Sequence, residues 1–225
     1  MRRSQGATYS SRGADESLSL TPQEGRVLAD FTKRIITSYV EDGRFVKPYQ
    51  SPSAKLQERR GVFVAFRGDR ELPNGRTERF SCCTGYLFPP VSLIQSAFDA
   101  SLNLAIRARS VFKLTRHHCE EMTFEVSVLT PPELIIVQNE LDYSREIKIG
   151  KDGVLIECGF LRGLLLPQVS QQLGLTPEEF LSECCLRAGL LADRWLQGKI
   201  RVYKFQAQTF TADNDIAHRD ESRGK

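Results

Sequence analysis

The sequence lacks the short motifs that mark several common kinds of site. It contains no P-loop, no G-x-G-x-x-G after a strand-like run and no G-x-S-x-G elbow, so these nucleotide-binding and hydrolase sites have no support. It also has no C-x-x-C pair, the usual ligand spacing of a structural zinc site. We therefore expect no bound metal, and no cofactor is indicated.

Long apolar runs and a strong charge of one sign are absent as well. No stretch approaches the roughly 20 apolar residues of a membrane span, and the basic start Met1–Ala7 has no apolar run behind it. We expect no membrane association and a cytoplasmic location. The formal net charge of +3 is mild and its basic and acidic residues are mixed along the chain, so charge does not support nucleic-acid binding.

The spacing of the cysteines is not typical of a disulfide-bonded protein. The six cysteines form two directly adjacent pairs, Cys82–Cys83 and Cys184–Cys185, with Cys119 and Cys158 standing alone. An even count is compatible with disulfides, but a chain of 225 residues can build a core without them. We favour reduced thiols.

Capping signals and hydrophobic periodicity predict the first half of the fold. Thr21, Pro22 and Glu24 begin a helix that Asp42–Gly43 ends. The segment 61–66 is typical of a buried strand, and a turn at 73–75 is expected to pair it antiparallel with 80–84. After these come a helix from Pro90 to about Arg109, a helical turn capped by Thr115, and a strand 122–129 with Glu125 on its polar face.

The second half continues the mixture of helices and strands. A hairpin is predicted about 151–153 within residues 147–158, followed by a strand at 160–166. Further elements are expected as helices at 168–173 and 176–189 and as a strand at 200–205 that continues toward Phe210. The interspersed order predicts an α+β fold, a mixed and mostly antiparallel sheet with flanking helices. We expect one domain over 19–212, with disordered tails at 1–18 and 213–225.

The stretch 79–90, at the end of a predicted strand, holds the strongest candidate site residues. Cys83 is a thiol beside Thr84 and Gly85, and Glu125 and Gln168 are further polar candidates. Each has a simpler interpretation: Cys83 as a small buried hydrophobe, Glu125 as a solvent-facing carboxylate and Gln168 as a helix cap. Alternation along a strand places Cys82 and Cys83 on opposite faces, so only one of them can line a given site.

Two other polar groups are assigned structural roles. His117 and His118 fall in the first turn of a short helix and are interpreted as solvated. Lys199–Phe205 interleaves basic and aromatic residues, which we interpret as the solvated face of a half-buried strand.

Several stretches together resemble the AMMECR-type domain family. Gly61–Val64 resembles the strand before the family signature Leu-Arg-Gly-Cys-Ile-Gly, and Phe80–Gly85 falls on the signature itself. The resemblance covers roughly residues 20–211 in the family's order. Its other matching stretches are 125–132, 163–169, 180–189, Trp195 and 203–210.

The resemblance implies an α+β fold of two unequal subdomains around a groove, with the signature near that groove. Cys83 and Gly85 match the signature, whereas Ser81 replaces its arginine and Cys82 its first glycine. Serine cannot make the bidentate contacts of an arginine, so a ligand role of that arginine is not carried over to Ser81. The resemblance also implies Memo-like or radical S-adenosylmethionine proteins as partners.

The sequence is compatible with two functional hypotheses. In the first, the chain is an enzyme component that binds a small or nucleotide-like substrate, with Cys83 catalytic and Thr84, Gly85, Glu125 and Gln168 binding the ligand. In the second, it is a non-catalytic binding or adaptor module that acts with a partner protein. A pKa of the Cys83 thiol well below about 7 would favour chemistry, and a pKa near that of a free thiol, about 8.5, would favour the module.

Overall fold

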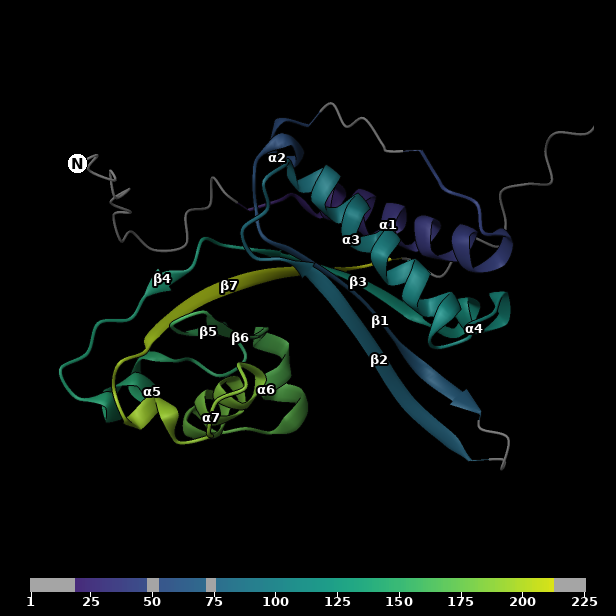
Figure 1. Ribbon diagram of the computed structural model, residues 1–225. Helices are drawn as coiled ribbons and strands as arrows, with labels where there is room; N and C mark the ends of the chain where they lie inside the picture. Colours follow the sequence, from purple (N-terminus) through teal and green to yellow (C-terminus); the bar gives the residue numbers. More distant parts are fainter. Residues whose placement is uncertain (1–18, 48–52, 72–75, 213–225) are drawn as a thin grey trace, which may run out of the picture. The chain divides into compact units, whose positions relative to one another are not determined.

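The computed structural model describes residues 19–47, 53–71 and 76–212 of the 225-residue chain (Figure 1). The predicted tails 1–18 and 213–225 lie outside the described residues. The elements in chain order are α1 (Pro22–Asp42), α2 (Ala54–Gln57), β1 (Val62–Glu71), β2 (Thr77–Tyr86), α3 (Leu93–Ser110), α4 (Arg116–Glu121), β3 (Thr123–Leu129), β4 (Glu133–Leu134), η2 (Glu140–Asp142), α5 (Tyr143–Glu146), β5 (Asp152–Cys158), β6 (Leu161–Leu165), α6 (Pro167–Leu173), α7 (Pro177–Arg187), η3 (Arg194–Leu196) and β7 (Arg201–Thr211).

The elements divide between two compact units, as the predicted pair of unequal subdomains requires. The larger unit contains Leu20–Pro131 together with the segment that begins at Gln206, and the smaller unit contains Pro132–Phe205. Strand β7 belongs to both, since its first residues lie in the smaller unit and its last residues in the larger one. The pairs β1–β2, β1–β3, β3–β7, β4–β7 and β5–β6 are all antiparallel, and the predicted α+β class with a mostly antiparallel sheet is confirmed.

Helix α1 begins and ends at the residues that its local signals predict. The hydroxyl of Thr21 accepts a hydrogen bond from the backbone N–H of Glu24 at 3.2 Å, and the Glu24 carboxylate accepts one from the N–H of Thr21 at 2.9 Å. This reciprocal pair satisfies two N–H groups that have no partner within the helix. Gly43 follows the last turn in the left-handed region with φ 69°, where a residue with a Cβ is strained.

Strands β1 and β2 form one long hairpin. They pair in an unbroken register from Val62 opposite Tyr86 to Glu71 opposite Thr77. The predicted reversal of the chain is confirmed by the antiparallel pairing of the two strands. The predicted turn at 73–75 lies outside the described residues. The charged residues after Phe66 lie beyond the predicted strand 61–66, and the structure continues β1 through them to Glu71. Their extended backbone is stabilised by the ladder of hydrogen bonds with β2.

The core of the larger unit lies between the sheet β2–β1–β3–β7 and the helices α1 and α3, which run side by side (Figure 1). Val64, Phe66, Phe124 and Val126 project from the strands into this core. The predicted face of β3 is therefore confirmed. Because successive strand residues point to opposite sides, Glu125 and its neighbours project from the other face of the sheet.

In the smaller unit, β5 pairs with β6 in a hairpin whose turn is Gly159–Phe160. Helix α7 packs on both strands, and Phe180, Cys184 and Trp195 belong to this core. The predicted hairpin about 151–153 is wrong. Residues 148–152 instead form a local turn, because the Asp152 carboxylate accepts a hydrogen bond from the N–H of Lys148 at 2.9 Å.

Helices α6 and α7 agree with prediction, whereas the short helices η2, α5 and η3 were not predicted. α6 ends at Gly174, which has φ 64°, and α7 begins with a capping box between Thr176 and Glu179. None of the helices in the described part of the chain is long and apolar enough to cross a lipid bilayer.

Candidate functional site

The sheet of the larger unit aligns Cys83 and Glu125 across strand β1. Cys83 on β2 is the direct partner of Ala65, and Ala65 is the direct partner of Glu125 on β3. Residues directly opposite one another in antiparallel strands share a face. The two candidates therefore lie in one row on the sheet face away from α1 and α3, with only the methyl group of Ala65 between them.

Glu125 is nearly buried and forms an ion pair with an arginine of the same sheet face. Its exposed fraction is 9%, which excludes a freely solvated carboxylate. Arg67 Nη2 lies 2.5 Å from Glu125 Oε1, while about half of the Arg67 side chain, 49%, remains exposed. Neither side chain forms a second ion pair or side-chain hydrogen bond among the described residues, so a carboxylate oxygen and several guanidinium N–H groups can accept a further partner.

Arg67 was not identified from the sequence because it follows the predicted strand 61–66, in a charged stretch that leads to the predicted turn. Its register explains its position: it lies opposite Ser81 on β2 and opposite Thr123 on β3. Ser81 is the position where the family signature has arginine. A guanidinium is thus present on this part of the sheet, supplied by the neighbouring strand. The alternation of Phe63, Ala65 and Arg67 would have predicted its face once the strand was extended.

The two adjacent cysteines are on opposite faces, as predicted. Cys82 is part of the core with an exposed fraction of 7%, whereas Cys83 is exposed. Desolvation by the surrounding protein, with Cys82 and Glu125 adding to it, raises the pKa of the Cys83 thiol to about 12. Accessible surface governs whether a reagent reaches the sulfur, and desolvation governs its charge. The thiol is therefore reachable but protonated at neutral pH.

Thr84 and Gly85 do not complete this site. Thr84 pairs with Val64, whose side chain points into the core, so Thr84 is on the face opposite to Cys83. Gly85 is on the same face as Cys83, but a Cβ there would lie 2.2 Å from the carbonyl oxygen of Val62 and 2.6 Å from Phe63 Cα. The absence of a side chain at Gly85 is thus required by the pairing of β1 with β2.

The position of Cys83 within its strand also differs from the prediction, which placed it at the strand end. It lies inside β2, which continues to Tyr86, and α3 does not begin until Leu93. The start of this helix is therefore not adjacent in sequence to the thiol. Gln168, the last candidate, is half-buried in the first turn of α6 in the smaller unit. A shared site with Cys83 stays a prediction.

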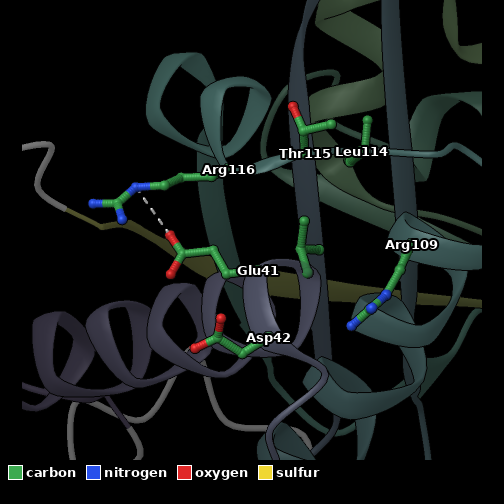
Figure 2. Close-up of a pocket in the computed structure, with 7 residues that line it drawn as sticks. Glu41, Asp42, Arg109, Leu114, Thr115 and Arg116 are labelled. Atoms are coloured by element: carbon green, nitrogen blue, oxygen red, sulfur yellow. Dashed lines mark ion pairs between the residues drawn. The ribbon is translucent and has the colours of Figure 1, made fainter.

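A second feature of the larger unit is an open hollow of about 390 Å³ beside the end of α1 (Figure 2). Arg116 Nε lies 3.4 Å from Glu41 Oε1 and 3.0 Å from Glu120 Oε1. Arg109 donates a hydrogen bond to the carbonyl of Tyr39 at 3.0 Å, next to the αL residue Gly43. These cations neutralise the carboxylates and the negative end of α1. The charged residues that line the hollow therefore have a structural role in ending the helix.

The histidines and cysteines in the described part of the chain form neither a metal-binding cluster nor a disulfide. His118 Nδ1 is 2.7 Å from the hydroxyl of Thr115 at the start of α4, and His117 is 3.7 Å from Glu121 one turn later. All six cysteines are free. Residues 19–47, 53–71 and 76–212 contain no group of three or more His, Cys, Asp or Glu residues that could hold a metal ion.

Comparison with known proteins agrees with the resemblance. The AMMECR1 family model matches residues 29–210. A protein of Thermofilum pendens is 37% identical over 205 residues, which cover 89% of this chain and 96% of the relative. A protein of Methanocaldococcus jannaschii is 36% identical over 193 residues, which cover 85% and 91%.

A solved structure is similar over most of its length. The crystal structure of an uncharacterised protein from Pyrococcus horikoshii has a TM-score of 0.71 and 34% sequence identity, and the match covers 84% of this chain and 91% of that one. The family model and the relatives both span far more than half of the sequence. The chain therefore belongs to the AMMECR1 family.

Proposed function

We propose that the larger unit is a non-catalytic binding module for a small polar molecule, with Glu125 and Arg67 as its recognition pair. The observation that carries the proposal is the strand register, which places a nearly buried carboxylate and a half-exposed guanidinium side by side on the face that bears Cys83. A ligand on this face meets an acceptor and a donor next to each other.

The charge of the pair indicates the chemical class of the ligand. Glu125 and Arg67 neutralise each other, so the site does not select strongly for an anion or a cation. An edge that presents a hydrogen-bond donor beside an acceptor satisfies the open carboxylate oxygen of Glu125 and the open N–H groups of Arg67 together. Nucleobases and primary amides have such an edge, and a nucleoside-like ligand fits this arrangement.

The protonated thiol supports binding over covalent catalysis. A nucleophilic cysteine needs a base or a nearby cation that lowers its pKa. At Cys83 the causes act in the opposite direction, because desolvation, Cys82 and Glu125 all raise the pKa. A neutral thiol on this face is a small and weakly polar contact for a ligand.

Thermal unfolding in the presence of each of the four common ribonucleosides tests the proposal. We expect at least one nucleoside to raise the Tm of the wild-type chain, because a ligand that binds only the folded state stabilises it. Arg67→Gln and Glu125→Gln should abolish this rise, whereas Cys83→Ser should retain it.

Arg79→Gln is the matched control for these variants. Arg79 lies on the same face of the same hairpin as Arg67 and forms an ion pair with Asp69 at 3.1 Å. Along β2 it is two residues beyond Ser81, on the side away from Cys83. It should behave as wild type. A wild-type chain that none of the nucleosides stabilises, or an equal loss in Arg79→Gln and Arg67→Gln, would contradict the proposed site.

The reactivity of Cys83 separates the binding function from the enzymatic one. Because the thiol is protonated at neutral pH, alkylation of Cys83 by iodoacetamide should be slow and should accelerate about tenfold per pH unit between pH ~8 and ~10. Cys82 should stay unlabelled in the folded chain because it is buried. Mass spectrometry of the peptide that contains Cys82 and Cys83 measures the extent of alkylation at each residue. A rate at Cys83 that is already maximal near pH 7 would show a thiolate and would favour catalysis.

A further inference from the structure

The smaller unit contains a buried carboxylate with two cationic partners. Glu157 on β5 has an exposed fraction of 6%. Its Oε1 is 2.7 Å from Arg162 Nε on β6, and its Oε2 is 3.0 Å from Arg201 Nη2 on β7. The hydroxyl of Tyr203 donates a hydrogen bond to Oε2 at 3.2 Å. Both oxygens of Glu157 are thus occupied, and three strands contribute to one cluster.

The position of this cluster follows from the strand pattern. Val154 and Ile156 project from β5 into the core beneath α7. Glu157 therefore projects from the other face, together with Arg162, its direct partner on β6. Val202 is in the same core, so Arg201 and Tyr203 also lie on the face with Glu157. The cluster belongs entirely to the smaller unit, whereas the pair Arg67–Glu125 belongs to the larger one.

The cluster has more positive charge and more donors than Glu157 can use. Two guanidinium groups surround one carboxylate, which leaves a net charge of +1. Each arginine forms no ion pair or hydrogen bond other than that with Glu157 among the described residues, and each keeps 62% of its side chain exposed. Burial, followed by the charge of Glu157, raises the pKa of Tyr203, so its phenol stays protonated and adds no competing negative charge.

The second arginine satisfies the other oxygen of Glu157 but leaves the cluster with an excess positive charge. One guanidinium neutralises one carboxylate, and a further cation on the same face adds repulsion unless an anion balances it. The planar guanidinium with several N–H donors is the side chain best suited to oxyanions. Anchoring both arginines to one buried carboxylate also restricts their rotamers, which lowers the entropic cost of binding.

We propose that Arg162 and Arg201 form a binding site for a phosphate group, with Glu157 and Tyr203 as positioning residues. The site takes the phosphate of a small molecule or free inorganic phosphate, since both present the same oxyanion. It goes beyond the function proposed above and does not depend on it, because its residues lie in the other unit.

Titration calorimetry with inorganic phosphate at constant ionic strength tests this site directly. The wild-type chain should bind phosphate, and Arg201→Gln and Arg162→Gln should each weaken binding at least about tenfold. Arg162→Lys keeps the charge but loses the planar donors, so it should bind between wild type and Arg162→Gln. Circular dichroism establishes beforehand that each variant is folded, and Arg162→Lys keeps the test available if either glutamine variant unfolds.

Arg187→Gln is the control in the same unit. Arg187 is exposed to a similar degree and pairs with Glu183 at 3.0 Å on the surface of α7. It should bind phosphate as wild type does. No phosphate binding by the wild-type chain, or an equal effect of Arg187→Gln and Arg201→Gln, would overturn the proposal. A glucose 6-phosphate titration then separates the sources: tighter binding than inorganic phosphate supports an organic phosphate, and equal binding supports the free ion.

Discussion

Gly163→Ala is expected to lower the free energy of unfolding by about 3 kcal/mol. The added Cβ would lie 2.2 Å from the carbonyl oxygen of Cys184 and 2.7 Å from the backbone nitrogen of Ala188. Both atoms belong to the backbone at the end of α7, so no flexible side chain can give way. Helix α7 packs on β6 through this glycine, and a methyl group there forces helix and strand apart. Urea unfolding followed by circular dichroism measures the loss.

Gly159→Ala is the matched control for this prediction. Gly159 lies in the turn before β6, and nothing is within 4 Å of its added Cβ. Its φ of 60° still makes alanine unfavourable, at a cost of about 1–2 kcal/mol. If Gly163→Ala cost no more than Gly159→Ala, the close approach of α7 to β6 would be wrong.

Phe124→Ala should destabilise the larger unit by about 3–5 kcal/mol. Phe124 is 1% exposed and is the direct partner of Phe66 across β3 and β1. Removing the ring leaves a cavity that the sheet and the helices above it cannot close. The change in the midpoint of urea unfolding, with the slope unchanged, gives the magnitude.

Phe88→Ala provides the comparison. Phe88 follows β2 and is 60% exposed, so its loss should change the free energy of unfolding by no more than about 0.5 kcal/mol. Similar effects of the two substitutions would mean that the predicted face of β3 is reversed and that Glu125, rather than Phe124, points to the core.

The helices could be predicted from the sequence because their signals are local. Thr21 with Glu24 and Thr176 with Glu179 each form a capping box within four residues, and the structure contains both. The hairpin about 151–153 was wrong for a related reason. Asp152–Gly153 is a turn signal, but the sequence does not show that Asp152 closes its turn onto Lys148 rather than between two strands.

The candidate site was less predictable because it depends on strand register. Cys83 and Glu125 are 42 positions apart, and only the pairing of each with Ala65 places them in one row. Thr84 follows Cys83 in the chain yet lies on the other face, so proximity in sequence was misleading. Arg67 was missed because a charged stretch does not by itself predict a strand. The ladder that holds it comes from the neighbouring strands.

The division of strand β7 between the two units has a consequence for how the protein can be dissected. The larger unit is not one continuous piece of chain, because Pro132–Phe205 is inserted between β3 and the strand residues that pair with it. A fragment that stops at Pro131 loses Ala207–Thr211, the partners of Leu129–Glu125. Its β3 would become an unprotected edge, open to pairing with a second molecule. The larger unit can therefore be isolated only by replacing the insertion with a short linker that retains the end of β7.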